Sequence, residues 1–225
     1  DLKEMRIDLA CALRWAARLG LHEGVCNHFS LAVPDADGAM RGNRFLINPY
    51  GWHWSEITAS SLVMVDANGN VIEGDNEVED TAFTIHRGIH VAAPHAVCVM
   101  HTHMPHTTAL TLLRDEDYNG LSLDIAEGDR IASKLGNRSV LMMASHGVTV
   151  TGPNVRECFN DLYYLERAAT FQVLARSTGG ELRTLSDDVV AHTARQMAEE
   201  RPKLAERHFS ALRRILEREE PEFLN

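Results

Sequence analysis

The sequence predicts one α/β domain formed by residues 1–225. Short apolar runs of strand length fill the middle of the chain, whereas helix-like segments occupy both ends. This arrangement is typical of helices packed on a sheet. A length of 225 residues suits one compact domain, and no repeat or low-complexity segment divides the chain.

The helices are predicted from apolar spacing and from their end signals. Gly20 follows the first periodic segment and is a natural C-terminal stop. Asp80 or Thr81 can cap a helix in the middle of the chain, which Pro94 ends. The expected helices cover about residues 2–19, 81–93, 108–113, 128–135, 154–176 and 187–219.

The strands are predicted where short apolar runs are bounded by turn residues. Residues 62–72 have the pattern of a β-hairpin, with residues 66–70 as its turn. Two continuous apolar runs, 96–101 and 140–144, are typical of fully buried strands. Shorter strands are expected at residues 45–47 and 148–150.

Composition argues against several classes of function. The formal net charge of −10 disfavours nucleic acid and anionic membranes as partners, because both require basic patches. The apolar runs are too short to cross a bilayer, and the charged residues that follow Asp1 do not fit a signal peptide. We therefore expect a cytoplasmic protein. Cys11 and Cys98 lie in apolar surroundings and are expected to be buried free thiols.

Three histidines are the candidate metal ligands. His101 and His103 are two residues apart in a strand, so both side chains point to the same face. This pair lies where one buried strand ends, and His146 follows the second, next to Gly147. Such strand ends line ligand crevices in α/β sheets. Three imidazoles leave coordination positions open, which is typical of catalytic sites, and the set suits zinc and manganese equally.

The other histidines have less specific patterns. His106 follows Pro105 and is a candidate acid–base group, although a histidine at the start of a helix often has no catalytic role. His86 and His90 are one helical turn apart. We expect these two to be half-buried packing residues, with metal ligation as the alternative.

Several motifs follow one another in a specific order along the chain. They are residues 24–30, 45–51, 62–69, 101–103 and 145–147, together with Gly152. From Leu9 to Arg176 the chain resembles the class II aldolase/adducin family, in its adducin-like branch. The resemblance implies an α/β/α fold with a central, mostly antiparallel sheet, and zinc or manganese bound by the three histidines. It also implies a homotetramer with active sites between subunits.

One motif departs from the family's sugar-phosphate aldolases. Those enzymes carry Ser-Ser-Glu before a helix; the serines hold the substrate phosphate and the glutamate is the catalytic acid–base. The matching positions are Asp80, Thr81 and Ala82. A carboxylate at Asp80 would repel a phosphate, and the alanine cannot carry a proton. The residues that bind the phosphate and the residue that acts as the aldolase base are therefore both missing.

The residues around the old phosphate pocket suit a substrate carboxylate or ring. The phosphate-loop threonine is replaced by a tyrosine here, whereas the family's asparagine and glycine are kept. The expected substrate-binding residues are Asn27, Tyr50, Gly51, Asp80 and Thr81. The expected catalytic residues are His28, Glu79 and His106; the glutamate lies one helical turn before Ala82 and is a candidate ligand or proton donor.

A metal site without the aldolase base favours decarboxylation. A divalent ion stabilises the negative charge that develops when carbon dioxide leaves a chelated carboxylate. The family's decarboxylases act on hydroxylated aromatic dicarboxylates, such as 3-hydroxy-2-methylpyridine-4,5-dicarboxylate (vitamin B6 breakdown) and 3,4-dihydroxyphthalate. The resemblance implies such a small carboxylate substrate here. Two alternatives stay open: an aldolase acting on a non-phosphorylated hydroxy-keto acid, and a non-enzymatic adducin-like interaction module.

Overall fold

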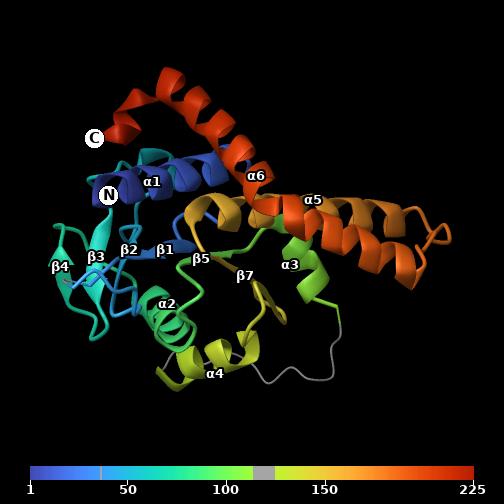
Figure 1. Cartoon of the computed structure of the whole chain (residues 1–225), viewed down its shortest axis with the longest axis horizontal. Helices are drawn as coiled ribbons and strands as arrows, with labels where there is room; N and C mark the ends of the chain where they lie inside the picture. The colour runs from blue at the N-terminus through green and yellow to red at the C-terminus, as the bar shows by residue number, and fades with distance from the viewer. Residues whose placement is uncertain (36, 114–124) are drawn as a thin grey trace.

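The chain folds around one antiparallel sheet with the strand order β4-β3-β2-β1-β5-β7-β6 (Figure 1). The computed structural model describes residues 1–35, 37–113 and 125–225. Each pair of neighbouring strands in this sheet is antiparallel. The strands are β1 (His28–Ala32), β2 (Arg44–Ile47), β3 (Val63–Asp66), β4 (Val71–Glu73), β5 (Cys98–Thr102), β6 (Val140–Met143) and β7 (Gly147–Gly152).

Helices cover both faces of this sheet. The α-helices are α1 (Leu2–Arg18), α2 (Asp80–Ala92), α3 (Pro105–Thr111), α4 (Ile125–Leu135), α5 (Val155–Ser177) and α6 (Asp187–Glu219). Two short 3-10 helices are η1 (Trp54–Glu56) and η2 (Pro221–Leu224). No helix in the described part of the chain combines the length and the apolar character needed to span a bilayer.

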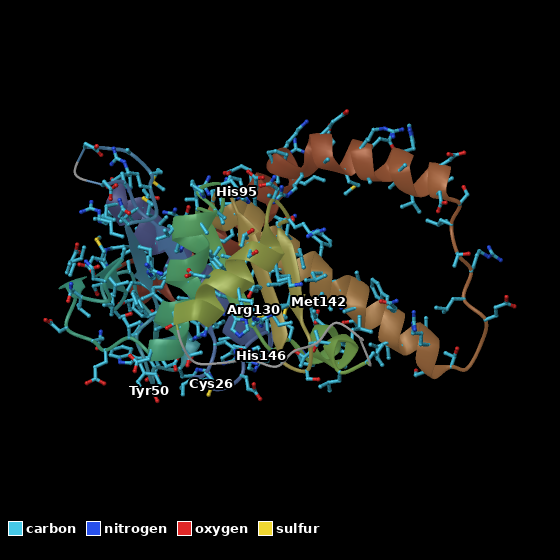
Figure 2. The ribbon with its side chains drawn as sticks, turned by 90° about the horizontal axis from the view of Figure 1, so that it is seen from below. Cys26, Tyr50, His95, Arg130, Met142 and His146 are labelled. Atoms are coloured by element: carbon cyan, nitrogen blue, oxygen red, sulfur yellow. The ribbon has the colours of Figure 1, made fainter. Side chains whose placement is uncertain are left out.

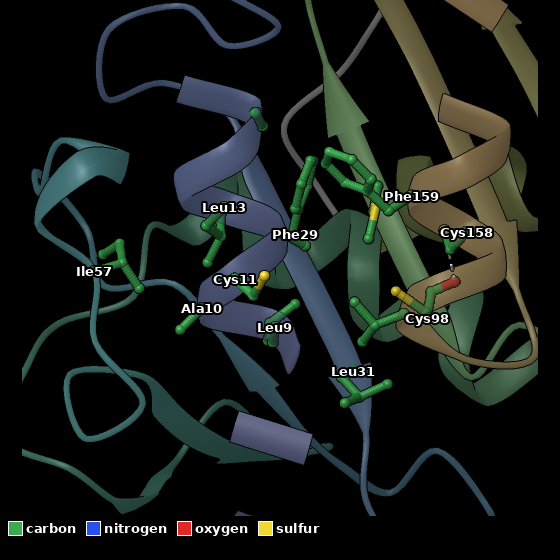
Figure 3. Packing of buried hydrophobic residues seen from close by; sticks show 14 of the residues in the cluster. Leu9, Ala10, Cys11, Leu13, Phe29, Leu31, Ile57, Cys98, Cys158 and Phe159 are labelled. Atoms are coloured by element: carbon green, nitrogen blue, oxygen red, sulfur yellow. Dashed lines mark hydrogen bonds between the residues drawn. The ribbon is translucent and has the colours of Figure 1, made fainter. Parts of the chain in front are cut away.

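The core on one sheet face is formed with α1 and α5. Leu9 of α1, Phe29 of β1 and Phe159 of α5 belong to the same buried cluster, and Figure 3 shows how they face one another. Cys11 and Cys98 are buried in this cluster as free thiols, as the sequence predicts. The hydrophobic surface removed from water here is the main stabilising contribution to the fold.

The opposite face of the sheet is covered by α2 and α4. Ile85 of α2 and Ile131 of α4 pack there against Val99 of β5. The next residue of the strand, Met100, belongs to the core on the α1 side, because successive side chains of a strand point to opposite faces. The predicted α/β/α architecture with an antiparallel sheet is therefore confirmed.

Two local predictions differ from the structure. The run at 140–144 was expected to be fully buried, but β6 is an edge strand paired only with β7, and Met142 is 41% exposed. Helix α2 is capped by Glu79, whose carboxylate accepts hydrogen bonds from the backbone N–H groups of Thr81 and Ala82, and not by Asp80 or Thr81. An apolar run in the sequence does not show how many strands will lie beside it in the sheet. The N-cap position is set by where the helix begins.

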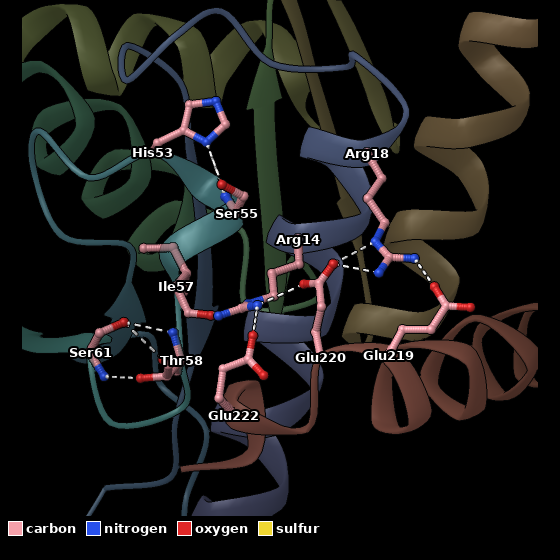
Figure 4. A network of polar contacts seen from close by, with 10 residues as sticks. All are labelled: Arg14, Arg18, His53, Ser55, Ile57, Thr58, Ser61, Glu219, Glu220 and Glu222. Atoms are coloured by element: carbon pink, nitrogen blue, oxygen red, sulfur yellow. Dashed lines mark hydrogen bonds and ion pairs between the residues drawn. The ribbon is translucent and has the colours of Figure 1, made fainter.

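Ion pairs connect α1 to the segment around η2. The buried Arg14 side chain donates to the carbonyl of Ile57 at 2.7 Å and to the carboxylates of Glu220 and Glu222 at 2.6 and 2.8 Å. Figure 4 shows these contacts beside those of Arg18. Because Arg14 is only 4% exposed, losing its partners would leave a buried charge unpaired.

The contact between α2 and α4 generates a first testable prediction. A Cβ atom at Gly88 would lie 2.5 Å from the backbone carbonyl carbon of Gly128, so Gly88→Ala must push the two helices apart. We expect the free energy of unfolding to fall by about 1–3 kcal/mol, measured by urea denaturation. Gly180→Ala is the matched control, because its nearest neighbour is the end of the Thr178 side chain. Equal stability of the two variants would contradict this account of the helix contact.

Candidate metal centre

Strand directions bring the three predicted ligands together. Strands β5 and β6 both pair antiparallel with β7, so they run in the same direction and end at the same edge of the sheet. His101 lies near the end of β5, His103 follows directly, and His146 lies in the turn after β6. The Nε2 atom of His146 is 3.1 Å from that of His101 and 3.2 Å from that of His103. The three side chains thus meet at one point, as the sequence predicts.

The outward-facing nitrogens show which atoms are available to a metal. Nδ1 of His101 donates to the carbonyl of Val148 at 3.0 Å, and Nδ1 of His103 bonds to the Glu23 carboxylate. Both rings therefore carry a proton on Nδ1 and direct Nε2 inward. Holding the outer nitrogen of a ligating histidine on a carboxylate or carbonyl is the usual arrangement around protein-bound metals.

Burial disfavours the charged form of two of the three rings, those of His101 and His146. Desolvation lowers the pKa of His101 well below its usual value and that of His146 to about 4, with further lowering by the neighbouring histidines. The Nε2 atoms of the three rings then face one another, an arrangement that a divalent cation stabilises. Among the described residues, these three histidines are the one group of His, Cys, Asp or Glu side chains whose ligand atoms lie close enough together to hold a metal ion. They fit a divalent ion with open coordination positions.

Gly147 makes the close approach of the ligand segments possible. A Cβ atom at this position would lie 2.5 Å from the carbonyl oxygen of Thr102 and 2.6 Å from Cδ2 of His103. Ser145, on the other side of His146, has φ of +54°, a left-handed conformation that is uncommon outside glycine. Unusual backbone geometry on both sides of the ligand indicates that its position is strictly determined.

The three histidines open into a pocket that holds several of the predicted residues. Its lining consists of Cys26, His28, Tyr50, Glu79, Thr81 and Ile85, together with the three histidines. Figure 2 shows Cys26, Tyr50 and His146 on the same side of the molecule, away from His95. Gly51, with φ of +77°, follows the exposed Tyr50 without lining the pocket, and Asp80 is exposed at the start of α2.

Asn27 lies in a small recess that shares residues with this pocket. Its Oδ1 atom accepts hydrogen bonds from the backbone N–H groups of Glu23 (2.8 Å) and His103 (3.2 Å), which fixes the orientation of the amide. Nδ2 is buried and, among the described residues, has no hydrogen-bond partner. A buried donor without a partner destabilises the protein until an acceptor occupies the recess.

Glu79 and His106 are both engaged in structural contacts. Both carboxylate oxygens of Glu79 accept hydrogen bonds at the N-terminus of α2, so a role as proton donor would require this cap to open. His106 does not line the pocket. Its Nδ1 and backbone N–H donate to the buried carboxylate of Glu166, each at 2.9 Å, and this carboxylate also accepts from Thr107.

Sequence reasoning missed several polar residues around the site. His86 and His90 were expected to be half-buried, but they are 0% and 1% exposed and hydrogen-bonded to Ser30. Glu23, the partner of His103, was also missed. Polar residues at buried positions of an amphipathic helix were the signal that was available for the two histidines.

Comparison with known proteins places this fold and site in a family. Residues 7–173 match the model of the class II aldolase and adducin N-terminal domain. The chain belongs to the class II aldolase and adducin family. It is 33% identical over 212 residues to a putative aldolase class 2 protein of Caulobacter vibrioides, covering 86% of this chain and 80% of that protein.

Solved structures agree with this membership. The crystal structure of an aldolase II superfamily protein from Pseudomonas syringae has a TM-score of 0.88 and 30% identity, covering 99% of this chain and 96% of that one. An L-fuculose 1-phosphate aldolase from Glaciozyma antarctica PI12 shares the fold, with a TM-score of 0.83, 22% identity and coverage of 98% and 92%. The rat alpha-adducin is 29% identical over 96% of this chain and 33% of its own length.

The metal centre generates a second prediction. Replacing His101 or His146 by alanine removes a ligand nitrogen, so we expect the bound zinc or manganese to fall at least about tenfold relative to the unmutated protein. Metal content after dialysis, measured by mass spectrometry, checks this. His95→Ala is the control, because His95 is exposed and lies away from His146 in Figure 2. Full metal content in the His101 and His146 variants would rule out this site.

Proposed function

We propose that the protein is a divalent-metal-dependent carboxy-lyase acting on a hydroxylated aromatic dicarboxylate. The observation that carries the proposal is the combination of an intact three-histidine site with Ala82 where the family's sugar-phosphate aldolases carry their catalytic glutamate. Ala82 is 2% exposed and borders the recess beside Asn27 and His28. Its methyl group supplies an apolar contact where an aldolase requires an acid–base group.

The pocket has the groups that an aromatic carboxylate requires. Ile85, Ala82 and the ring of Tyr50 offer apolar surface for a flat substrate. The unpartnered amide of Asn27 is a donor for one carboxylate. A bound divalent ion would supply Lewis-acid stabilisation of the charge that develops as the carbon–carbon bond breaks. Zinc and manganese are the candidate ions, and the three histidines suit both.

The contacts of Glu79 bear on the source of the proton that replaces carbon dioxide. Its carboxylate accepts hydrogen bonds from two backbone N–H groups, so both of its oxygens are engaged. In the proposal Glu79 therefore holds the start of α2, including Thr81, at the edge of the pocket. The proton is then supplied by water or by another group that lines the pocket.

The strongest alternative is an aldolase acting on a non-phosphorylated hydroxy-keto acid. The same metal site would serve it, because retro-aldol cleavage and decarboxylation both leave an electron pair next to a carbonyl or ring. It would need an acid–base group other than residue 82. A non-enzymatic module, the third possibility, does not account for three imidazole rings directed at one point.

Release of carbon dioxide tests the proposal. We expect the manganese- or zinc-loaded protein to release it from hydroxylated pyridine or benzene dicarboxylates, and His101→Ala to lower the rate by at least about 100-fold. Gas-phase detection of carbon dioxide and chromatography of the monocarboxylate product are the measurements. His95→Ala is again the control. Formation of an aldehyde from a hydroxy-keto acid, without carbon dioxide from any aromatic dicarboxylate, would favour the aldolase.

We also propose that the protein is a homotetramer with active sites between subunits. Helices α5 and α6 both project from the same side of the body of the molecule, and Figure 2 shows their far ends apart (Figures 1 and 2). Large apolar side chains are exposed on this projecting arm, namely Phe171, Leu174, Leu182, Leu185, Val189, Val190 and Met197. An apolar surface of this kind favours burial against copies of the same chain.

The apolar arm generates a prediction about assembly. Phe171 is 59% exposed, and Phe171→Glu would place a charge in the proposed interface, so we expect the tetramer to dissociate. Gln172→Glu introduces the same charge at the next exposed position of α5 and is expected to leave the tetramer intact. Sedimentation velocity at several protein concentrations distinguishes the species. An active monomer in the unmutated protein would contradict shared active sites.

A further inference from the structure

A row of buried polar side chains lies behind the metal centre. It consists of His28 and Ser30 of β1 and of His86 and His90 of α2, hereafter the histidine row. Their exposed fractions are 5%, 0%, 0% and 1%. Hydrogen bonds connect His28 to His86, His86 to Ser30, and Ser30 to His90. Buried side chains in such a series must each match a donor with an acceptor.

The far end of the histidine row determines where its first proton lies. Nδ1 of His90 is 2.9 Å from the carbonyl oxygen of Ala96. A carbonyl only accepts, so this nitrogen must carry a proton. Burial lowers the pKa of His90 to about 4, so the ring is neutral and its Nε2 is bare. The hydroxyl of Ser30, 2.7 Å away, must therefore donate to that Nε2.

The proton positions of His86 and His28 follow in the same way. Having donated its proton to His90, the Ser30 oxygen can only accept from Nδ1–H of His86. His86 is also kept neutral by burial, which lowers its pKa well below the usual value, so its Nε2 is bare. Nδ1 of His28, 2.6 Å away, then donates to it. With Nδ1 of His28 as the donor, a neutral His28 ring has a bare Nε2.

This bare nitrogen belongs to a ring that lines the pocket. His28 borders the pocket together with the three metal-binding histidines, and its ring stacks on His101 with centroids 4.9 Å apart. Strand pairing explains the position, because His28 of β1 is directly opposite His101 of β5. Nε2 of His28 has no hydrogen-bond partner among the residues that the structure describes.

We propose that the histidine row fixes His28 as a hydrogen-bond acceptor for a hydroxyl group of the substrate. His86, Ser30 and His90 are positioning residues that act through His28. A bare nitrogen repels a carboxylate, which has no proton to donate, and attracts an O–H group. The substrate carboxylates are then left to the metal and to the free amide of Asn27. The hydroxylated aromatic character of the ligand rests on the proposed function; the protonation pattern of the row does not.

Nuclear magnetic resonance tests the protonation pattern without any turnover. Two-bond proton–nitrogen correlation spectra of the ¹⁵N-labelled, zinc-loaded protein report which ring nitrogen of each histidine is protonated. We expect His28, His86 and His90 all to carry the proton on Nδ1 near pH 7. A neutral His28 with its proton on Nε2, or a charged His28, would overturn the proposal.

Variants of Ser30 test whether the row transmits this pattern. Ser30→Ala removes the hydroxyl that joins His86 to His90, so we expect the His86 and His28 signals to shift towards a mixture of protonation patterns. Ser30→Thr keeps a hydroxyl and is expected to keep the pattern of the unmutated protein. Unchanged His28 signals in a folded Ser30→Ala variant would overturn the role of the row. If both variants unfold, the spectrum of the unmutated protein still decides where the His28 proton lies.

Ligand binding tests recognition of the hydroxyl. Salicylate and 2-methoxybenzoate differ in the proton that His28 would accept, and we compare their Kd values by calorimetry on the zinc-loaded protein. We expect the preference for salicylate to fall about tenfold in His28→Phe, the effect of losing one hydrogen bond in a buried site. His95→Ala should keep the full preference. The same preference in His28→Phe as in the unmutated protein would overturn the proposal.

These outcomes are separate from those of the decarboxylation assay. Absence of carbon dioxide release, with Nδ1-protonated His28 and a His28-dependent preference for salicylate, would contradict the carboxy-lyase function and support the inference. Carbon dioxide release with His28 protonated on Nε2 would contradict the inference alone. The two proposals can therefore fail independently.

Discussion

The site depends on how strands β1, β5, β6 and β7 pair. Because β5 and β6 both run antiparallel to β7, their ends deliver His101 and His146 to one edge of the sheet. The register of β1 on β5 adds His28 directly opposite His101. Hydrophobic burial on both faces holds this register, because a slip of one residue would turn each strand's core side chains to the opposite face. The chemistry of the pocket is thus a consequence of strand order.

The fold and the meeting of the three histidines could be predicted because both are encoded locally. His101 and His103 are two residues apart at the end of one strand, and the bounds of α6 match the helix predicted at residues 187–219. The histidine row could not be predicted in this way, because it joins residues of β1 and α2 that meet only when the helix packs on the sheet. The cap at Glu79 and the edge position of β6 were missed for a related reason. Each depends on where an element begins or on which elements lie beside it. The apolar spacing within one segment of the sequence does not contain that information.

Burial lowers the pKa of the buried and half-buried histidines around the pocket. Desolvation lowers the pKa of His28, His90 and His146, so each is a neutral ring whose two nitrogens have opposite roles. In the candidate metal centre the acceptors on the Nδ1 side of His101 and His103 turn Nε2 inward. In the histidine row the carbonyl of Ala96 sets the same polarity from the other end. Two separate groups of contacts therefore direct lone pairs to one pocket, where they require a cation or a hydroxyl proton.

The pocket has a hydrogen-bond donor on one side and a hydrogen-bond acceptor on the other, and this arrangement affects which substrate it would favour. Asn27 offers N–H groups and His28 offers a lone pair, so a ligand with a carboxylate on one side and a hydroxyl on the other is held in one orientation. A hydroxy-keto acid would satisfy both groups as well as an aromatic acid. In the proposed function the apolar wall favours the aromatic acid. Ala82 and Ile85 are buried against this region, and apolar surface contributes to binding only where the substrate brings a matching apolar face. A flat ring has such a face, whereas a short hydroxy-keto chain covered with oxygens does not.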